Sequence, residues 1–367
     1  TEGAFTGFWP ATLCLTVTCT PYVHLLVAAA LERCPQGEEE AARSLGASQW
    51  RVIKTVVAPR LRPTWGFASV LVGLYVVSDF GAVAVLNCEV LTWRLYQAHS
   101  AQEAVLLGGS LIGMVLPLLV LVRLLHGGLH DERSLIGRAP TLRPARGQVM
   151  LGLAGARLLM VGVGVAIPTL TMLHWVGQGL SNNLEFADVL EPASTSVTIA
   201  AAGAGLTLCA SVVLAAAGAR LRGVWGGLAD NAIYLTSALP GILVAIGLLQ
   251  LVLNLRMELS SVDWSAIRDA GVFLFVGFAM RFMSQGYAAL KPAFMRLDQS
   301  QLESARSLGA GALKRFWTVT LPQIRPSLLA AYVLLFLSIA KELPITLMLI
   351  PPGDSTLAYA IFDANNE

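Results

Sequence analysis

The chain has 367 residues, of which 55% are hydrophobic and 13% are charged. Soluble globular domains carry about 25% charged residues. The composition therefore excludes an ordinary soluble domain and predicts an all-α integral membrane protein. The net charge of +2 gives no support to nucleic-acid binding, because the basic residues gather in alternate loops between apolar stretches.

Eight apolar stretches are long enough to cross a bilayer, which takes roughly 20 helical residues. They cover residues 8–31, 64–86, 103–125, 155–176, 195–218, 229–253, 268–290 and 327–350. Loops after the odd-numbered stretches are rich in Arg and Lys, whereas loops after the even-numbered ones carry fewer bases or balance them with acids. The positive-inside rule then predicts that every odd-numbered loop is cytoplasmic.

The first cytoplasmic loop, residues 32–63, contains a helix–glycine–helix pattern. Its defining residues are Glu40, Ala41, Ala42, Gly46 and Pro59. A short helix should end at the glycine, the residue best suited to the left-handed conformation at a helix C-terminus. A second short helix should end at the proline. The two alanines leave a flat face that a partner surface can approach closely.

The same pattern returns 263 residues later, in the loop 291–326. Here its residues are Glu303, Ser304, Ala305, Gly309 and Pro322. Aligned without gaps, residues 40–83 and 303–346 are identical at 16 of 44 positions, where chance would give roughly 3 to 5. A single copy fits an ordinary amphipathic loop equally well, whereas two copies at the same place among the spans favour a shared function.

Six predicted spans separate the two loops, so both copies have the same orientation and the duplication is parallel. The first half, residues 1–125, has one span before its loop, and the second half, residues 149–367, has four. The polar stretch 126–148, with its Gly and Pro residues, is the expected cytoplasmic linker. Because the halves are unequal, we expect a fragment of a twelve-span parent whose second half lacks its last span.

The sequence offers no metal site and no nucleotide site. His126 and His130 have the spacing of a metal pair on a helix, but Gly127 and Gly128 between them disfavour a helix, so we favour a solvated pair. The five cysteines have no ligand spacing. None of the four lysines follows a glycine, so the chain has no P-loop and is not expected to be an ATP-hydrolysing enzyme.

Four charged residues and a proline lie at bilayer depth in the predicted spans. They are Asp79, Arg281, Lys341, Glu342 and Pro344. A charge at that depth costs at least about 3 kcal/mol, so such residues face the bundle interior or water and pair with one another. Asp79 and Glu342 occupy equivalent positions of the repeat. The set marks either a translocation path or gate, or a structural ion-pair network such as Lys341 with a carboxylate. Pro344 should break or kink the last helix.

The two loops resemble the EAA loop of ABC-transporter permeases, which reads E-A-A-x-x-x-G and is followed by a proline. In that family the loop is the coupling helix that docks into a groove of a cytoplasmic ATPase, and the resemblance implies this role for both loops here. The first copy departs from the family pattern at Ala58, before Pro59, and the second at Ser304.

Three further segments are similar to the fused permeases of ferric-iron importers. They are Lys341-Glu342-Leu343-Pro344-Ile345-Thr346, Asp79-Phe80-Gly81 and Leu239-Pro240-Gly241. The resemblance implies a bacterial inner-membrane (plasma-membrane) permease that receives ferric iron from a periplasmic solute-binding protein. It also implies a dimer of cytoplasmic ABC ATPases, which binds ATP and Mg, while this chain itself binds no cofactor.

Three alternatives stay open. Fused thiamine permeases are built alike, and permeases for sulfate, polyamines and molybdate share the fold as separate subunits. An ion-coupled secondary transporter would use the charges at bilayer depth as a proton relay, although the parallel repeat counts against it. A membrane enzyme or respiratory subunit has little support, because the sequence has no histidine pair at haem spacing and no cysteine cluster.

Overall fold

Every regular element that the structure describes is a helix. The computed structural model describes residues 6–31, 36–131, 148–181, 186–221, 223–258, 263–269 and 271–366. Those ranges contain no strand. Lipid offers no hydrogen-bond partner, so a membrane-spanning segment must pair its backbone groups internally, as a helix does. The predicted all-α membrane fold is confirmed.

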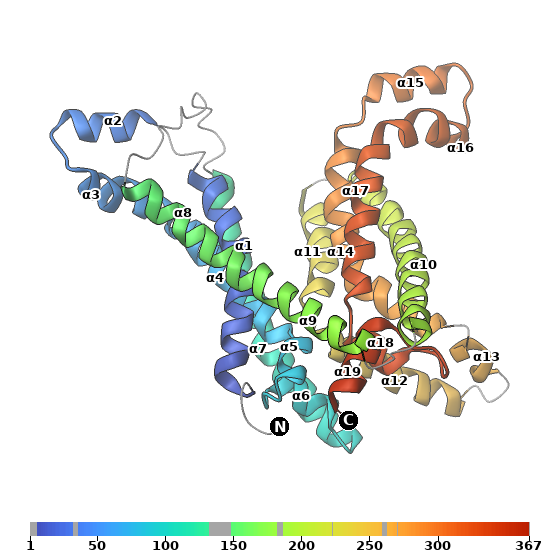
Figure 1. Ribbon diagram of the computed structural model, residues 1–367. Coiled ribbons are helices and arrows are strands. Elements are labelled where there is room, and N and C mark those ends of the chain that lie inside the picture. Colours follow the sequence, from blue (N-terminus) through green and yellow to red (C-terminus); the bar gives the residue numbers. More distant parts are fainter. Residues whose placement is uncertain are drawn as a thin grey trace. The chain divides into compact units, whose positions relative to one another are not determined.

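The chain forms two compact units, and the first comprises Thr1–Arg94 and His99–Leu184. Its elements are α1 (Phe8–Leu31), α2 (Gln36–Ser44), α3 (Gln49–Val52), η1 (Ile53–Val57), α4 (Ala58–Ser78), α5 (Gly81–Val85), the start of α6 (Leu91–Tyr96), α7 (Ala101–Asp131), α8 (Gln148–Val161), η3 (Gly162–Ala166) and α9 (Ile167–Ser181). The elements labelled η are single π-helical turns. In this unit α4 packs between α1 and α7, and α8, η3 and α9 form one long, exposed helix (Figure 1).

The second unit comprises Leu95–Ala98 and Glu185–Glu367. Its helices are α10 (Phe186–Gly218), α11 (Gly223–Ala238), α12 (Gly241–Glu258), α13 (Trp264–Asp269), α14 (Val272–Met295), α15 (Gln299–Ser307), α16 (Ala312–Arg315), η4 (Phe316–Thr320), α17 (Leu321–Ala340), α18 (Pro344–Leu349) and α19 (Leu357–Asn366). The helices α10, α14 and α17 pack against one another (Figure 1). Phe278, Tyr287 and Leu335 are fully buried in the core between them.

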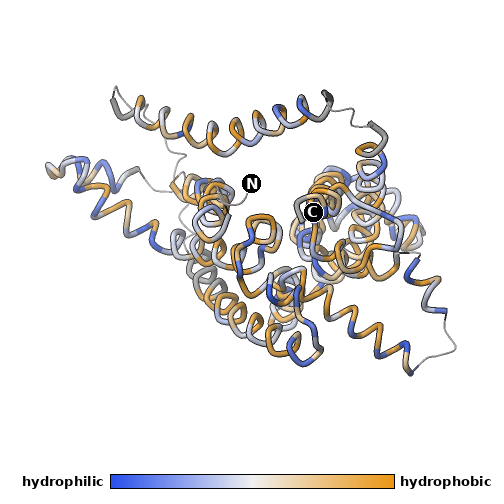
Figure 2. Tube along the Cα trace, turned by 60° about the horizontal axis from the view of Figure 1, so that its bottom comes forward, coloured by the Kyte–Doolittle hydropathy of each residue, from blue (hydrophilic) through white to orange (hydrophobic). Residues whose placement is uncertain are grey.

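Seven of the eight predicted spans overlap a described helix that is long and apolar enough to cross a bilayer, and hydrophobic residues dominate these helices (Figure 2). The exception is 64–86. There α4 stops at Asp79, whose backbone is extended (φ −71°, ψ 137°), and α5 is a separate short helix. The prediction of one continuous helix over 64–86 is therefore wrong, because the chain leaves the helical conformation at the acid. The prediction of one continuous helix over 229–253 is also wrong, because α11 ends at Ala238 and α12 begins at Gly241, on either side of Leu239 and Pro240.

The internal repeat extends to the boundaries of the helices. Five pairs of elements begin 263 residues apart, namely α2 and α15, α3 and α16, η1 and η4, α4 and α17, and α5 and α18. Equal spacing along both copies means that the same sequence pattern has produced the same local fold twice.

Pro59 and Pro322 do not end the second short helix, and this prediction is wrong. Residues 49–78 run without interruption through α3, η1 and α4, and residues 312–340 do so through α16, η4 and α17. Proline lacks an amide hydrogen, and its ring clashes with the carbonyl of residue i−4 in a regular α-helix. The wider π-turn directly before each proline moves that carbonyl aside, so each proline lies in the first turn of the following helix.

The helix α7 also continues further than its sequence predicts. It reaches Asp131 and so includes Gly127 and Gly128, which argue against a helix around His126 and His130. The apolar run that precedes the glycines carries the helix through them, because propagating a formed helix costs far less than starting one. Of the predicted linker 126–148, residues 132–147 lie outside the described part of the chain.

Candidate functional site

Both helix–glycine–helix loops close with the same hydrogen bonds. In the first, the Gly46 amide donates to the Arg43 carbonyl (2.9 Å) and the Ala47 amide to the Ala42 carbonyl (3.0 Å). Gly46 has a φ of +83°, a left-handed conformation that costs glycine no Cβ clash. This is the Schellman arrangement, which satisfies the last carbonyls of a helix.

The second loop repeats this geometry. Gly309 has a φ of +77°, its amide donates to the Arg306 carbonyl (3.0 Å), and the Ala310 amide donates to the Ala305 carbonyl (3.0 Å). The sequence therefore predicted both turns correctly, down to the residue that reverses the chain. Each turn fixes where its first helix, α2 or α15, stands relative to the helix that follows.

Each loop exposes large apolar side chains. Leu45 is 88% exposed and its counterpart Leu308 is 86% exposed. Trp50, Leu313 and Trp317 are also exposed. Of the patterned residues, Glu40, Ala41, Glu303 and Ser304 are exposed, and Ala42 and Ala305 are half-buried. Apolar side chains exposed on a polar loop are typical of a surface that a partner covers.

The second loop also has a fixed start. Asp298 caps α15, and its Oδ1 accepts hydrogen bonds from the Ser300 amide (3.0 Å) and the Ser300 hydroxyl (2.7 Å). The hydroxyl hydrogen bond, helped by the amide, lowers the pKa of the Asp298 carboxyl. The carboxylate therefore stays charged and keeps its place at the positive end of the helix.

Two of the charged residues predicted at bilayer depth meet in the second unit. Arg281, in the first half of α14, lies with its Nε 3.7 Å from Oε1 of Glu342, which follows α17. Their side chains are only 17% and 11% exposed. Arg281 also donates through Nη1 to the carbonyl of Leu239, at the break between α11 and α12. One guanidinium therefore contacts two places where a helix is interrupted.

Gly241 makes this arrangement possible. It is the first residue of α12 and lies so close to Glu342 that a β-carbon would collide with the Oε1 atom of that carboxylate. The segment Leu239-Pro240-Gly241 thus contributes a free carbonyl, a helix break and the space for a buried acid. A carbonyl released by a helix break is tolerated at membrane depth where protein groups satisfy it.

The remaining predicted residues of this set lie apart. Lys341 is exposed at the end of α17, and within the described residues it forms no ion pair, so the network of Lys341 with a carboxylate does not occur there. Pro344 begins α18 and is buried, and the break that it favours extends over residues 341–343. Glu342 itself donates from its backbone amide to Ile339 (3.0 Å).

In the first unit, Asp79 takes a different role from its counterpart Glu342. Its Oδ2 accepts from the Ala82 amide (3.1 Å) at the start of α5, and its carbonyl accepts from the Thr92 hydroxyl (2.9 Å). The residue equivalent to Arg281 in this copy is Thr18, which brings no charge. The repeat therefore preserves an acid at a helix break and changes its partner.

Sequence reasoning missed one cluster. Asp230 on α11 binds the Lys291 ammonium of α14 through both carboxylate oxygens (2.5 Å each) and accepts from the hydroxyl of Tyr287. Lys291 lies 5.6 Å from the Tyr287 ring centre, and Tyr287 is fully buried against Gly218. An acid at the edge of an apolar span was the available signal, because such a residue needs a buried partner.

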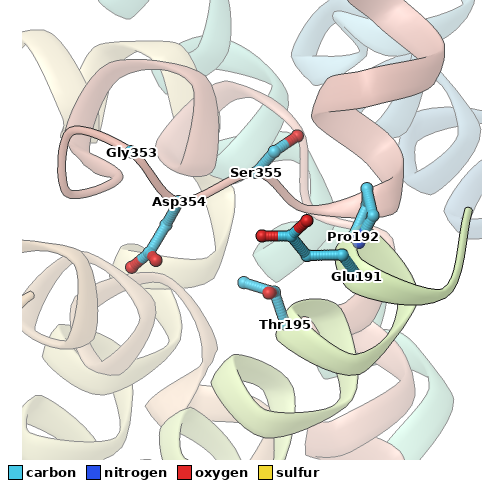
Figure 3. Close-up of a pocket in the computed structure, with 6 residues that line it drawn as sticks. All are labelled: Glu191, Pro192, Thr195, Gly353, Asp354 and Ser355. Atoms are coloured by element: carbon cyan, nitrogen blue, oxygen red, sulfur yellow. The ribbon is translucent and has the colours of Figure 1, made fainter. Parts of the chain in front are cut away.

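A polar cavity of about 330 Å³ opens near the start of α10 in the second unit. Its lining consists of Glu191, Pro192, Thr195, Gly353, Asp354 and Ser355. Figure 3 shows the two carboxylates and two hydroxyls arranged around the space. The cavity offers oxygen atoms and a negative field, which suit cations. The described residues contain no group of three or more His, Cys, Asp or Glu that could hold a metal ion.

Comparisons with known proteins agree on one class. The family described as the binding-protein-dependent transport system inner membrane component matches residues 2–131 and 186–367. A ferric-iron transport system permease of Haemophilus influenzae is 25% identical over 98% of this chain and 71% of that relative. A putrescine transport system permease of Escherichia coli K12 is 30% identical over 52% of this chain and 66% of that relative.

A further relative carries a different solute in its name. A putative 2-aminoethylphosphonate transport system permease of Salmonella typhimurium is 30% identical over 48% of this chain and 66% of that relative. All three relatives are named as transport system permeases. Because the family match covers most of the sequence and includes both duplicated loops, this chain belongs to the inner-membrane components of binding-protein-dependent transport systems, as an ABC permease with two fused EAA-loop halves.

Proposed function

We propose that this chain forms the translocation path of an ATP-binding-cassette importer for ferric iron. A periplasmic binding protein delivers the solute, and two copies of a cytoplasmic ATPase dock on the loops 32–63 and 291–326. The alternation of basic and acidic loops supports a cytoplasmic position for both loops. The chain supplies no nucleotide site of its own, so ATP and Mg belong to the partner ATPase.

The observation that carries the coupling role is the identical geometry of the two loops. Two surfaces that share a turn, a helix register and an exposed leucine suit two copies of one partner. Glu40 and Glu303 lie exposed on these surfaces. Their carboxylates are available to pair with basic residues of a docked ATPase.

The charged residues at the helix breaks support a path or gate at bilayer depth. Arg281 and Glu342 are partly buried, Glu342 lies at the break between α17 and α18, and the Arg281 guanidinium contacts both this acid and the break between α11 and α12. Asp79 lies at the corresponding break of the first copy. Breaks of this kind are where membrane transporters place solute contacts.

Ferric iron is supported by a relative, named for ferric-iron transport, whose alignment extends over nearly the whole chain. The putrescine and 2-aminoethylphosphonate permeases match only about half of it. Carboxylate oxygens such as those of Asp79 and Glu342 also suit a hard cation. Thiamine, or another small solute, is the alternative substrate for the same role.

The test is uptake of labelled ferric iron by cells that lack their own system and carry this permease with its ATPase and binding protein. The control is Glu40→Ala combined with Glu303→Ala, which removes both exposed carboxylates and leaves the turns intact. We expect uptake in the first strain and its loss in the second, while the protein level stays constant.

Three outcomes separate the alternatives. Uptake of labelled thiamine, putrescine or 2-aminoethylphosphonate in place of iron would keep the permease role and change its substrate. Uptake that stops when the membrane potential collapses at constant ATP would indicate an ion-coupled transporter. A permease that neither transports nor retains an ATPase on purification would contradict the proposal altogether.

A further inference from the structure

Each duplicated loop is tied to its span at a second point, and the two ties differ in chemistry. In the first copy, Arg60 in the first turn of α4 donates through Nη2 to Oε1 of Glu38 on α2. In the second copy, Gln323 Nε2 in the first turn of α17 donates to Gln301 Oε1 on α15 (3.0 Å). Both contacts join residues that are 22 positions apart and 263 residues from their counterparts.

These side-chain contacts link the start of α2 to α4 and the start of α15 to α17, and so restrict how each short helix can move. The turn at Gly46 or Gly309 joins the C-terminal end of α2 or α15 to the helix that follows, and this turn by itself leaves the angle between the two helices free to change. The side-chain pair attaches the other end, near the start of the same helix. With two attachments, α2 must move with α4, and α15 with α17.

The helices α4 and α17 lead directly to the acids at the helix breaks. From Arg60 the helix α4 runs to Ser78 and Asp79, and from Gln323 the helix α17 runs to Ala340 and then Glu342. At 1.5 Å per residue, the helical part of the first path covers about 27 Å and that of the second about 26 Å. Pro63 and Pro326 each remove one backbone hydrogen bond near the start of the path. Beyond these prolines each helix is uninterrupted as far as its break, so that a displacement at its start can reach the acid.

We propose that Glu38–Arg60 and Gln301–Gln323 are equivalent positioning pairs that make each coupling helix move as one body with the span leading to its acid. The first pair is ionic and the second is neutral, so salt weakens the attachment in the first half and spares the second. This inference rests on the proposed coupling role of the loops, but the attachment itself is measurable without substrate or ATPase.

The first experiment is hydrogen exchange of the full chain in lipid nanodiscs, comparing the peptides that cover α2 and α15. Glu38→Ala should speed exchange in α2 roughly two- to five-fold, the range expected when one exposed ion pair is lost. Gln301→Ala should speed exchange in α15 to a similar degree. The matched control is Glu89→Ala, which removes the exposed Glu89–Arg94 ion pair (3.1 Å) elsewhere in the first unit and should leave α2 unchanged.

The repeat supplies the rescue variants. The double substitution Glu38→Gln with Arg60→Gln installs the second copy's pair in the first copy, and Glu38→Arg with Arg60→Glu reverses the ionic pair. Both should restore slow exchange in α2. Raising the salt from about 0.05 M to about 0.5 M should speed exchange of α2 in the native chain and not in the Gln–Gln variant. The Glu39–Arg43 pair (3.8 Å) is present in both chains and cancels in this comparison.

The second measurement is the amount of solute transported per ATP hydrolysed by the reconstituted importer. Glu38→Ala should lower this ratio two- to five-fold, and the Gln–Gln variant should recover it. Unchanged exchange in Glu38→Ala would overturn the attachment. Altered exchange with an unchanged ratio would overturn its role in coupling. If the native chain binds no ATPase, the proposed function fails, and the exchange result still decides whether the pairs attach the helices.

Discussion

Single residues decide whether charges can be held inside this bundle. Arg281 serves Glu342 and the Leu239 carbonyl together, and the acid fits only because Gly241 has no side chain. A buried ion pair contributes little net stability, since the cost of desolvating the two charges offsets much of their attraction. If the two charges fit together poorly, however, the desolvation cost is no longer offset and the folded state is destabilised. The position of one glycine therefore sets the geometry of the charged group.

Substitutions at two glycines of α12, Gly241 and Gly247, test whether the missing side chain of Gly241 sets the position of the Glu342 carboxylate. We expect Gly241→Ala to lower the free energy of unfolding by about 1–3 kcal/mol, because its β-carbon overlaps the Glu342 carboxylate and displaces it from Arg281. Gly247→Ala, on the same helix with no atom within 4 Å of the new β-carbon, should be neutral or slightly stabilising. Denaturation of both variants in lipid nanodiscs measures the difference, and equal effects would refute the overlap.

At the scale of helices, hydrogen bonds and an ion pair join α11 to α14 at two points. Arg281 holds the end of α11 through the Leu239 carbonyl, and Lys291 with Tyr287 holds Asp230 on the same helix. Lys291 lies eight residues before α15, so the second fastening adjoins the loop of the second half. The two cations of α14 thus keep α11 in register along much of its length.

The Asp230–Lys291 pair allows a test of this fastening at the element scale. Asp230→Leu or Lys291→Met alone should lower the free energy of unfolding by about 1–3 kcal/mol, because each leaves a partly buried charge without its counter-ion. The double variant should lose less than the sum, since it leaves neither charge behind. A double-mutant cycle from denaturation midpoints gives the coupling energy, and strict additivity would show that the two side chains do not stabilise each other.

For the whole molecule, a repeated feature outside the spans is a pair of exposed loop surfaces, which we propose as docking sites for the ATPase. Leu45 and Leu308 occupy the same place after α2 and α15, at nearly equal exposure. Exposed leucines lower the solubility of a protein unless a partner covers them. Two equal surfaces suit a dimeric partner, in which each subunit covers one loop. The proposed ATPase dimer has that property.

Affinity for the ATPase tests this at the scale of the assembly. Leu45→Glu or Leu308→Glu should each weaken binding about ten-fold, because covering a leucine gives about 1.5–3 kcal/mol and tenfold corresponds to 1.4 kcal/mol. Met257→Glu, an equally exposed position at the end of α12 on the predicted outer side, is the matched control and should bind normally. Titration of purified ATPase onto permease nanodiscs measures all three. Equal weakening by Met257→Glu would contradict docking at the loops.

The sequence by itself determined the features that depend on neighbours along the chain. Hydropathy predicted seven spans that overlap long apolar helices, the 263-residue offset predicted the duplicated helices, and Gly46 and Gly309 predicted both left-handed turns. Local rules failed at Pro59 and Pro322, where a π-turn admits the proline. They also failed over 64–86, where the helix breaks at Asp79, and over 229–253, where α11 ends before Leu239 and α12 begins at Gly241.

Only the tertiary structure decided which charges meet. Arg281 pairs with Glu342, and Asp230 pairs with Lys291 across 61 residues of sequence. Composition shows that a charge at bilayer depth needs a partner, but many partners satisfy that need. The choice follows from which helices pack side by side and where they are interrupted, and these depend on the whole set of side-chain contacts rather than on any local pattern.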